Sequence, residues 1–204
     1  MAIELKICGN ATISDVIELS KLDVDYIGIV TDPISPRFVK REFLSIVKKY
    51  TNKPIVSVKV NGDISEILKD LSVVEYVQIH RILTDSELEL LRSYDTRRLI
   101  LYVPASLEYK SYLRKVINIT EKILIDSIKK GIEIDINIVK EIFKDYPNLG
   151  VGGKINLSNI SNFIGLNPKW IDISSSVEIY PGKKSIEKVK KIIEVIKYGN
   201  IHDK

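Results

Sequence analysis

The chain has 204 residues, of which 45% are hydrophobic and 28% are charged, and its formal net charge is +4. This balance excludes a disordered chain and is typical of a globular protein. Because 31 basic residues are offset by 27 acidic ones, we expect neither a nucleic acid nor a membrane as the main partner. The single cysteine excludes an internal disulfide, and no cluster of cysteine and histidine residues indicates zinc, so we expect no metal.

The N-terminal segment does not resemble a secretion signal. Residues 1–9 read MAIELKICG, without the basic region and the following apolar region of a signal peptide. No run of about 18 uninterrupted apolar residues, the length of a membrane span, occurs in the sequence. We therefore expect a cytoplasmic protein without a membrane-spanning segment.

Short runs rich in isoleucine and valine recur along the chain, bounded by Gly, Pro, Asn, Asp or Ser, as is typical of strands. The predicted strands are 3–8, 26–30, 55–60, 76–80, 98–103, 122–126, 149–153 and 170–174. Amphipathic patterns between them predict helices. These patterns cover 12–21, 39–50, 63–71, 84–94, 136–146, 157–164 and 185–197, with 106–117 as a less regular one. Thr12 or Ser14 is expected to cap the first helix, and Thr84 with Glu87 has the spacing of a capping box.

Eight strands that alternate with eight helical segments predict an α/β fold, a single (β/α)8 TIM barrel of eight parallel strands with short loops. We expect residues 1–204 to form this one domain, close to the lower size limit of such barrels. An open doubly wound sheet is the alternative. It would use fewer strands and show a glycine-rich phosphate turn after the first strand. The sequence CGNAT at 8–12 is not such a turn, so the barrel is favoured.

The alternation of residues within each strand predicts which side chains point into the barrel. In the fourth strand, for example, Val77 and Ile79 oppose Gln78 and His80. The apolar set is expected to face the helices. The polar set then points inward, and its last members reach the C-terminal mouth, where barrel enzymes have their active sites. The side chains predicted to converge there are Cys8, His80, Asp126, Asp172 and Ser174.

Two loops rich in small residues follow the seventh and eighth predicted strands. Gly152 and Gly153 lie in the first loop, and Ser174, Ser175 and Ser176 lie in the second. Small side chains let backbone N–H groups approach a ligand closely, and barrels commonly bind phosphate between these two loops. We therefore expect a phosphate site there, with two ordinary turns as the alternative interpretation.

Arg37 follows the second predicted strand, in the sequence TDPISPRFV at 31–39. Pro33 and Pro36 stiffen this loop, so the guanidinium group has little entropy to lose on binding a ligand. The planar fork of arginine suits a carboxylate. A surface arginine that caps the following helix is the alternative interpretation.

Cys8 and Asp126 are candidates for a base and an acid. A thiol removes a proton only as the thiolate, and Lys6, on the same strand face, is a possible source of positive charge. A carboxyl donates a proton only if burial or a nearby negative charge keeps it protonated. A buried inert cysteine and a salt-bridged aspartate are the alternative. His80 is the only histidine outside the C-terminal tail, where we expect His202 to be frayed.

Several motifs, in chain order, resemble those of the phosphoribosylanthranilate isomerase family, barrel enzymes of tryptophan biosynthesis. The matching segments are LKICG at 5–9, SPRFV at 35–39, VSVKVN at 56–61, VQIH at 77–80, LIDS at 124–127, GVGGKINLSNI at 150–160 and IDISSSVEIYPGKKS at 171–185. The resemblance covers nearly the whole chain. It implies that Cys8 is the general base, Asp126 the general acid and Arg37 the ligand of the anthranilate carboxylate.

The same resemblance implies the rest of the site. Gln78, His80 and Asp172 are expected to bind the substrate. The phosphate is expected at Gly152, Gly153, Ser174, Ser175 and Ser176. The implied reaction is an Amadori rearrangement of N-(5-phosphoribosyl)anthranilate by acid–base catalysis, which requires no metal and no organic cofactor. The partner is then a phosphorylated small molecule, and the protein is expected to be a monomer or a homodimer.

The chain departs from the family pattern at three places. Arg81 stands where a glycine usually follows the strand-four histidine, and the segment 128–135 keeps only Gly131 and Asp135 of a glycine-rich loop. Ser176 replaces a glycine. Two alternative functions remain. A related sugar-phosphate isomerase would use Asp126 with Asp172 and leave Cys8 idle, and a non-catalytic phosphate-binding barrel would be consistent with the altered loop.

Overall fold

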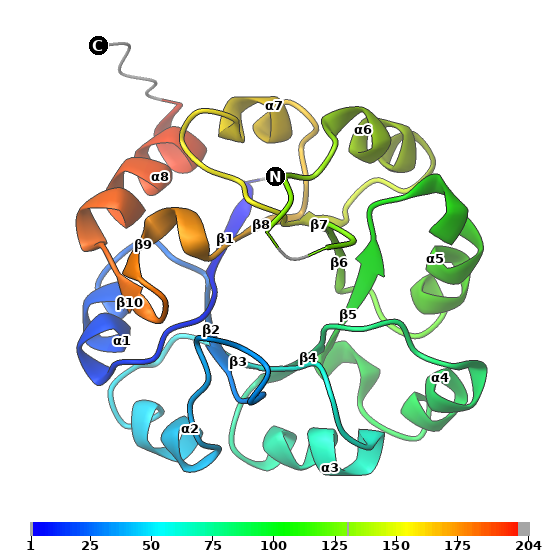
Figure 1. Ribbon diagram of the computed structural model, residues 1–204, viewed down its shortest axis with the longest axis horizontal. Helices are drawn as coiled ribbons and strands as arrows, with labels where there is room; N and C mark the ends of the chain where they lie inside the picture. Colours follow the sequence, from blue (N-terminus) through cyan, green and yellow to red (C-terminus); the bar gives the residue numbers. More distant parts are fainter. Residues whose placement is uncertain (1, 130, 200–204) are drawn as a thin grey trace.

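In residues 2–129 and 131–199, which the computed structural model describes, eight parallel strands close into a barrel. Each strand pairs with its neighbour in sequence, and β1 closes the barrel by pairing with β8. The predicted (β/α)8 fold is therefore confirmed (Figure 1). The strands are β1 (Glu4–Ile7), β2 (Tyr26–Val30), β3 (Ile55–Lys59), β4 (Tyr76–Ile79), β5 (Leu99–Pro104), β6 (Ile123–Asp126), β7 (Gly150–Val151) and β8 (Trp170–Ile173).

The helices surround the barrel, as Figure 1 shows. They are α1 (Ile13–Ser20), α2 (Glu42–Val47), α3 (Ile64–Leu68), α4 (Asp85–Leu91), α5 (Lys110–Ile117), α6 (Ile136–Asp145), α7 (Ile160–Ile164) and α8 (Ile186–Tyr198). Each predicted helix is present, although α2, α3, α4 and α7 are shorter than their patterns by three residues or more. The less regular pattern at 106–117 begins with a 3-10 turn, Leu107–Tyr109, before α5.

The predicted N-caps are present. The Thr84 hydroxyl accepts from the backbone N–H of Glu87, and the Glu87 carboxylate accepts from the N–H of Thr84, which completes the capping box. At α1 the cap is Thr12, whose hydroxyl accepts from the N–H of Asp15. These local bonds fix where two helices begin, because they satisfy N–H groups that have no partner within the helix.

Among the described residues, buried apolar side chains form two clusters that follow the predicted strand alternation. The larger cluster lies between strands and helices and includes Leu5 and Ile7. The smaller one fills the barrel interior and includes Cys8, Leu124 and Trp170. The Trp170 ring needs the space beside Gly150, where a Cβ atom would lie 2.1 Å from it. The inward and outward faces of the strands are therefore as predicted.

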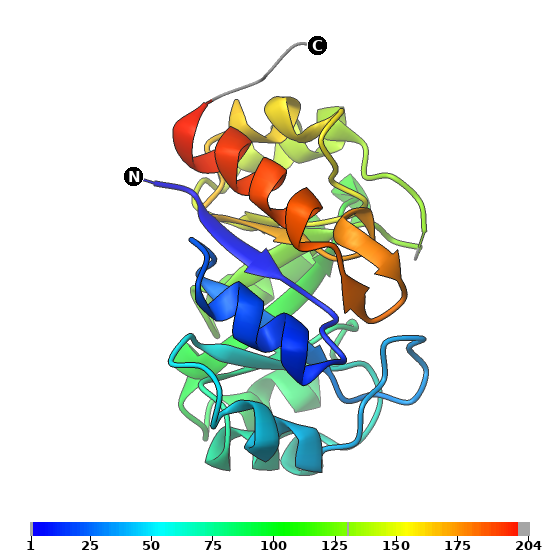
Figure 2. The same ribbon diagram turned by 90° about the vertical axis from the view of Figure 1, so that its left-hand side faces the viewer.

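A short hairpin between β8 and α8 was not predicted. It consists of β9 (Glu178–Tyr180) and β10 (Lys183–Lys184), which pair antiparallel around Gly182, at φ +90°. Figure 2 shows it projecting beyond the C-terminal end of β8, beside the start of α8. Strands of three and two residues are too short to give a periodic pattern, so the sequence shows them only as a loop.

His202, which the sequence analysis expected to be frayed, lies outside the described residues. Within the part of the chain that the structure describes, no helix combines the length and the apolar character needed to cross a bilayer.

Candidate active site

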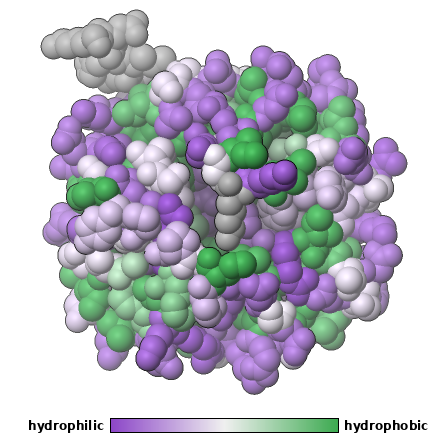
Figure 3. All heavy atoms as spheres, in the orientation of Figure 1, coloured by the Kyte–Doolittle hydropathy of each residue, from purple (hydrophilic) through white to green (hydrophobic). Residues whose placement is uncertain are grey.

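A cavity of about 340 Å3 lies at the C-terminal mouth of the barrel. Figure 3 shows this face, hollowed near its centre and surrounded by both hydrophilic and apolar residues. Most of the predicted site residues line the cavity. These are Cys8, Arg37, Gln78, His80, Asp126, Gly153, Asp172, Ser174 and Ser175. The structure thus brings together residues from six strands or the loops that follow them.

Two of the predicted phosphate residues do not line this cavity. Gly152 is buried behind it, where a Cβ atom would lie 3.0 Å from Oδ2 of Asp126. The Ser176 hydroxyl turns away and donates to the carbonyl of Ile155 at 2.6 Å. Gly152 therefore makes room for the carboxyl group, and Ser176 holds two loops together.

Cys8 follows directly after β1 and is buried at the cavity wall. Its backbone is held by β8 and the loop beyond it, because its N–H donates to Ile173 and its carbonyl accepts from the Ser174 hydroxyl. Burial raises the pKa of the thiol above its ordinary value. The positive charges of Lys6 and Lys184 act in the opposite direction.

Lys6 and Asp172 form an ion pair inside the barrel, with 2.9 Å between Nζ and Oδ2. The Lys6 side chain is wholly buried, and burial alone would lower its pKa. The neighbouring Asp172 carboxylate and the Cys8 side chain together outweigh this effect, so the Lys6 pKa is raised. The other oxygen of Asp172, Oδ1, is buried without a hydrogen-bond partner among the described residues.

Asp126 ends β6 and lines the same cavity. Its Oδ1 accepts from the backbone N–H of Ser127 at 2.6 Å and from the Ser127 hydroxyl at 3.2 Å. Burial, and after it the negative charge of Asp172, raises the pKa of Asp126 to about 7. The carboxyl is therefore half protonated near neutral pH, as a general acid requires.

His80 lies beside Asp126, with 3.9 Å between Nε2 and Oδ2. Its Nδ1 is 3.1 Å from the amide nitrogen of Gln78, and its ring packs on Tyr102 with 4.4 Å between ring centres. An amide that donates to Nδ1 leaves the imidazole proton on Nε2, which faces Asp126. The Oε1 atom of Gln78 is buried and has no partner in the described part of the chain.

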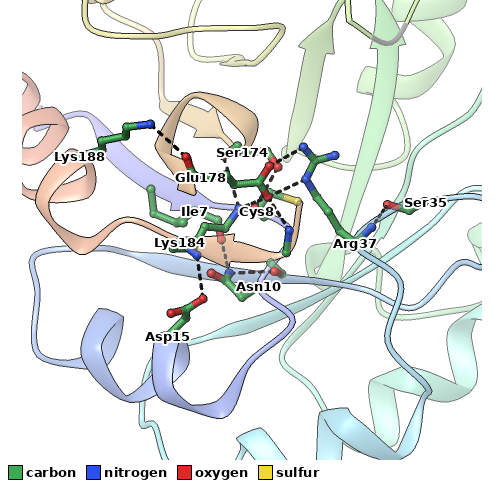
Figure 4. A network of polar contacts seen from close by, with 12 residues as sticks. Ile7, Cys8, Asn10, Asp15, Ser35, Arg37, Ser174, Glu178, Lys184 and Lys188 are labelled. Atoms are coloured by element: carbon green, nitrogen blue, oxygen red, sulfur yellow. Dashed lines mark hydrogen bonds and ion pairs between the residues drawn. The ribbon is translucent and has the colours of Figure 1, made fainter. Parts of the chain in front are cut away.

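Arg37 reaches the cavity from the loop after β2. Its guanidinium group donates to both carboxylate oxygens of Glu178, on β9, as Figure 4 shows. The Ser35 hydroxyl accepts from the backbone N–H of Arg37. A Cβ atom at Gly9, which has φ +77°, would lie 2.3 Å from Cδ of Arg37, so a side chain there would displace the arginine.

Glu178 is a buried carboxylate that the sequence analysis did not single out. Besides Arg37 it accepts from Lys184 Nζ at 2.8 Å and from the N–H of Gly182 at 3.0 Å. Burial opposes its ionisation, but Arg37 and Lys184 hold the pKa of Glu178 below its ordinary value. Its place within the SSSVE motif was the only signal in the sequence.

The loop after β7 is tied to the loop after β6. The side-chain amide of Asn159 donates to Glu133 at 2.8 Å and to the carbonyl of Lys154 at 3.3 Å, and its oxygen accepts from the N–H of Asn156. Gly153, at φ +102°, lets the backbone turn beside Asp126. Lys154 lines the cavity and adds a positive charge that the sequence analysis missed.

No group of three or more His, Cys, Asp or Glu side chains is arranged to hold a metal ion within residues 2–129 and 131–199.

Comparisons with known proteins agree with this geometry. A family model described as N-(5'phosphoribosyl)anthranilate (PRA) isomerase matches residues 5–195. The chain is 65% identical to the N-(5'-phosphoribosyl)anthranilate isomerase of Saccharolobus solfataricus over 203 residues, which are 99% of this chain and 100% of the relative. Identity to the enzyme of the same name from Sulfolobus acidocaldarius is 42%, over 96% of each chain. A solved phosphoribosyl anthranilate isomerase in complex with reduced 1-(o-carboxyphenylamino)-1-deoxyribulose 5-phosphate aligns with a TM-score of 0.80 at 27% identity, over 96% of this chain and 98% of that chain.

Proposed function

The chain belongs to the N-(5'-phosphoribosyl)anthranilate isomerase family, and we propose that it catalyses the Amadori rearrangement of N-(5-phospho-β-D-ribosyl)anthranilate to 1-(2-carboxyphenylamino)-1-deoxy-D-ribulose 5-phosphate. Under this proposal the protein acts in tryptophan biosynthesis, in the cytoplasm, as a single domain and as a monomer or homodimer. One observation supports the proposal most: a carboxyl whose pKa is raised to about 7, Asp126, shares a cavity with the thiol of Cys8.

The first step opens the sugar ring. Asp126 donates its proton to the ring oxygen, and the bond from that oxygen to C1′ breaks. The lone pair of the anthranilate nitrogen then forms a C=N double bond to C1′, which gives a protonated imine. The raised pKa of Asp126 keeps the required proton on the carboxyl near neutral pH.

The second step moves a proton from carbon. The positive charge of the protonated imine makes the C2′ hydrogen acidic, and the Cys8 thiolate removes it to give an enolamine. The enolamine then tautomerises: the C2′ hydroxyl becomes a carbonyl and C1′ gains a proton, which yields the amino-ketone. The iminium group of the substrate itself accepts the electron pair in this step.

The two ends of the substrate are held by different loops. Arg37 is proposed to bind the anthranilate carboxylate through N–H groups that Glu178 does not occupy. Gly153, Ser174 and Ser175 line the cavity at the loops proposed to bind the phosphate, and Lys154 adds a positive charge there. Holding both ends keeps the reacting carbons between Asp126 and Cys8, which accounts for much of the expected rate gain.

The test follows the fluorescence of phosphoribosylanthranilate, generated in situ, with the purified protein and with Cys8→Ser and Asp126→Asn. We expect rapid loss with the parent, and a fall in kcat of about 10²–10⁴-fold in each variant. Asp145→Asn, an exposed aspartate on α6, is the matched control and should keep full activity. Melting curves of all variants show whether folding is unchanged.

Other results would redirect the assignment. Full activity in Cys8→Ser would favour an isomerase that uses Asp126 with Asp172, whose carboxylates face the same cavity. Tight binding of a product analogue without turnover by the parent would favour a non-catalytic phosphate-binding barrel.

A further inference from the structure

The thiol of Cys8 lies close to two ammonium groups that are wholly buried. Lys6 precedes it by two residues on β1, so both side chains are on the inward face of the strand. Lys184 comes from β10 of the hairpin, more than 170 positions later in the chain. Its Nζ lies 3.4 Å from the carbonyl oxygen of Ser174, whose hydroxyl donates to the Cys8 carbonyl (Figure 4). A buried lysine is costly unless its charge is used or paired.

Each ammonium group is anchored by one carboxylate. Lys6 pairs with Asp172 at 2.9 Å, and Lys184 pairs with Glu178 at 2.8 Å. These pairs hold the lysines in place, because a lysine that rotated away would give up its carboxylate partner inside a buried site. Glu178 is also shared with Arg37, so this side of the thiol carries more positive than negative charge.

The described groups that bear charge or titrate around the thiol come from several elements. They are Lys6 on β1, Arg37 after β2, Glu178 on β9, Lys184 on β10, Asp172 on β8, and, elsewhere in the cavity lining, His80 after β4, Asp126 at the end of β6 and Lys154 after β7. The first five of these, which act on or adjoin the thiol, are three cations and two anions among the described residues. The balance therefore favours a negative charge on sulfur.

We propose that Lys6 and Lys184 stabilise the thiolate of Cys8, the form that removes the C2′ proton. They are positioning residues that act through charge, and neither is required to touch the substrate. In a buried site a cation within about 4–6 Å favours the anionic form of a neighbour strongly, whereas desolvation disfavours it. The two lysines thus offset the cost of burying the base. The inference rests on the proposed role of Cys8.

The test uses the fact that Cys8 is the only cysteine. The ultraviolet absorbance of the thiolate and the rate of alkylation by iodoacetamide, both followed against pH, report this one thiol without any turnover. The variants are Lys184→Met and Lys6→Met. Lys191→Met is the matched control, because it removes the same charge from an exposed pair with Glu187 on α8. Cys8→Ser supplies the background signal.

We expect the titration midpoint of the thiol to rise by about one pH unit in Lys184→Met and in Lys6→Met, which slows alkylation at neutral pH about tenfold. Lys191→Met should titrate like the parent. Lys184→Met is the decisive variant if Lys6→Met does not fold, since Glu178 keeps Arg37 as its partner. An unchanged midpoint in folded Lys184→Met would overturn the inference.

The isomerase assignment and the electrostatic role of Lys6 and Lys184 can each be overturned without the other. An inactive parent whose thiol midpoint still rises in both lysine variants would overturn the isomerase assignment and leave the electrostatic role intact. An active parent whose midpoint does not move in either variant would overturn the electrostatic role alone.

Discussion

Glu178 accepts two parallel hydrogen bonds from the Arg37 guanidinium group, from Nε at 2.7 Å and from Nη2 at 2.6 Å. The two residues are 141 positions apart in sequence. Such paired, charge-assisted bonds fix the plane of the guanidinium as well as its position. Arg37 lines the cavity, and Glu178 supports it from the hairpin behind.

We expect Glu178→Gln to raise KM for phosphoribosylanthranilate about tenfold or more, with a smaller change in kcat, because the arginine loses its charged support. Steady-state kinetics with a substrate analogue that lacks the carboxylate provides the discriminating measurement. With that analogue the parent and the variant should have similar KM values. Glu187→Gln, which changes an exposed glutamate on α8, is the control. An equal loss with both substrates would contradict a role through Arg37.

Asp126 should make stability depend on pH. Its folded pKa of about 7 lies above the ordinary value of 3.8, so the ionised carboxylate is disfavoured in the fold. The free energy of unfolding should therefore fall as pH rises from about 4 to about 7, by roughly 2–4 kcal/mol for this group. Asp126→Asn should remove that slope and be more stable than the parent at about pH 8. Urea unfolding at about pH 5 and pH 8 measures the free energy of unfolding of the parent and of Asp126→Asn. The same change in that free energy between the two pH values in both proteins would refute the expectation.

The pH profile of kcat/KM should show two apparent pKa values, which belong to Asp126 and Cys8 as a coupled pair. The proposed productive form has one proton, on Asp126, and a thiolate at Cys8. Because the pKa of Cys8 is raised and that of Asp126 is about 7, kcat/KM should increase near pH 7 and fall at higher pH. Asp172→Asn should move the lower limb to more acid pH, since the Asp172 charge helps to raise the pKa of Asp126. A lower limb that stays in place in this variant would count against the coupling.

Gly28→Ala should impair catalysis through the position of the thiol. A Cβ atom at Gly28, on β2, would lie 2.9 Å from Sγ and 3.0 Å from Cα of Cys8, so the cysteine must shift. We expect kcat to fall at least about tenfold, since small misplacements of a reacting group are costly. Gly165→Ala, where the nearest atom is 3.6 Å away, is the matched control. Equal kcat values in the two variants would disprove the steric account.

The barrel itself could be predicted from the sequence because its causes are local. Strand alternation separates Leu5 and Ile7 from Lys6 and Cys8, and the same rule places Asp126 and Asp172 inside. Capping by Thr12 and Thr84 depends on neighbours within three residues. The parallel order then brings the ends of all strands to one mouth, so most of the candidate site could be named in advance.

Other parts of the site were missed because they depend on contacts between distant segments. The hairpin that carries Glu178 and Lys184 is too short to produce a pattern, and its support of Arg37 spans most of the chain. The hydrogen bond from the Ser176 hydroxyl to the carbonyl of Ile155 likewise joins two loops that are 21 positions apart.

The sequence by itself determined the alternation of strands and helices, the inward face of each strand and the residue types at the barrel mouth, because these follow from periodicity and short-range bonds. Only the tertiary structure decided which charges surround each reactive group. Burial and the pairing of Lys6 with Asp172 shift the pKa values of Cys8 and Asp126, and such shifts arise from desolvation and from charges brought together by folding.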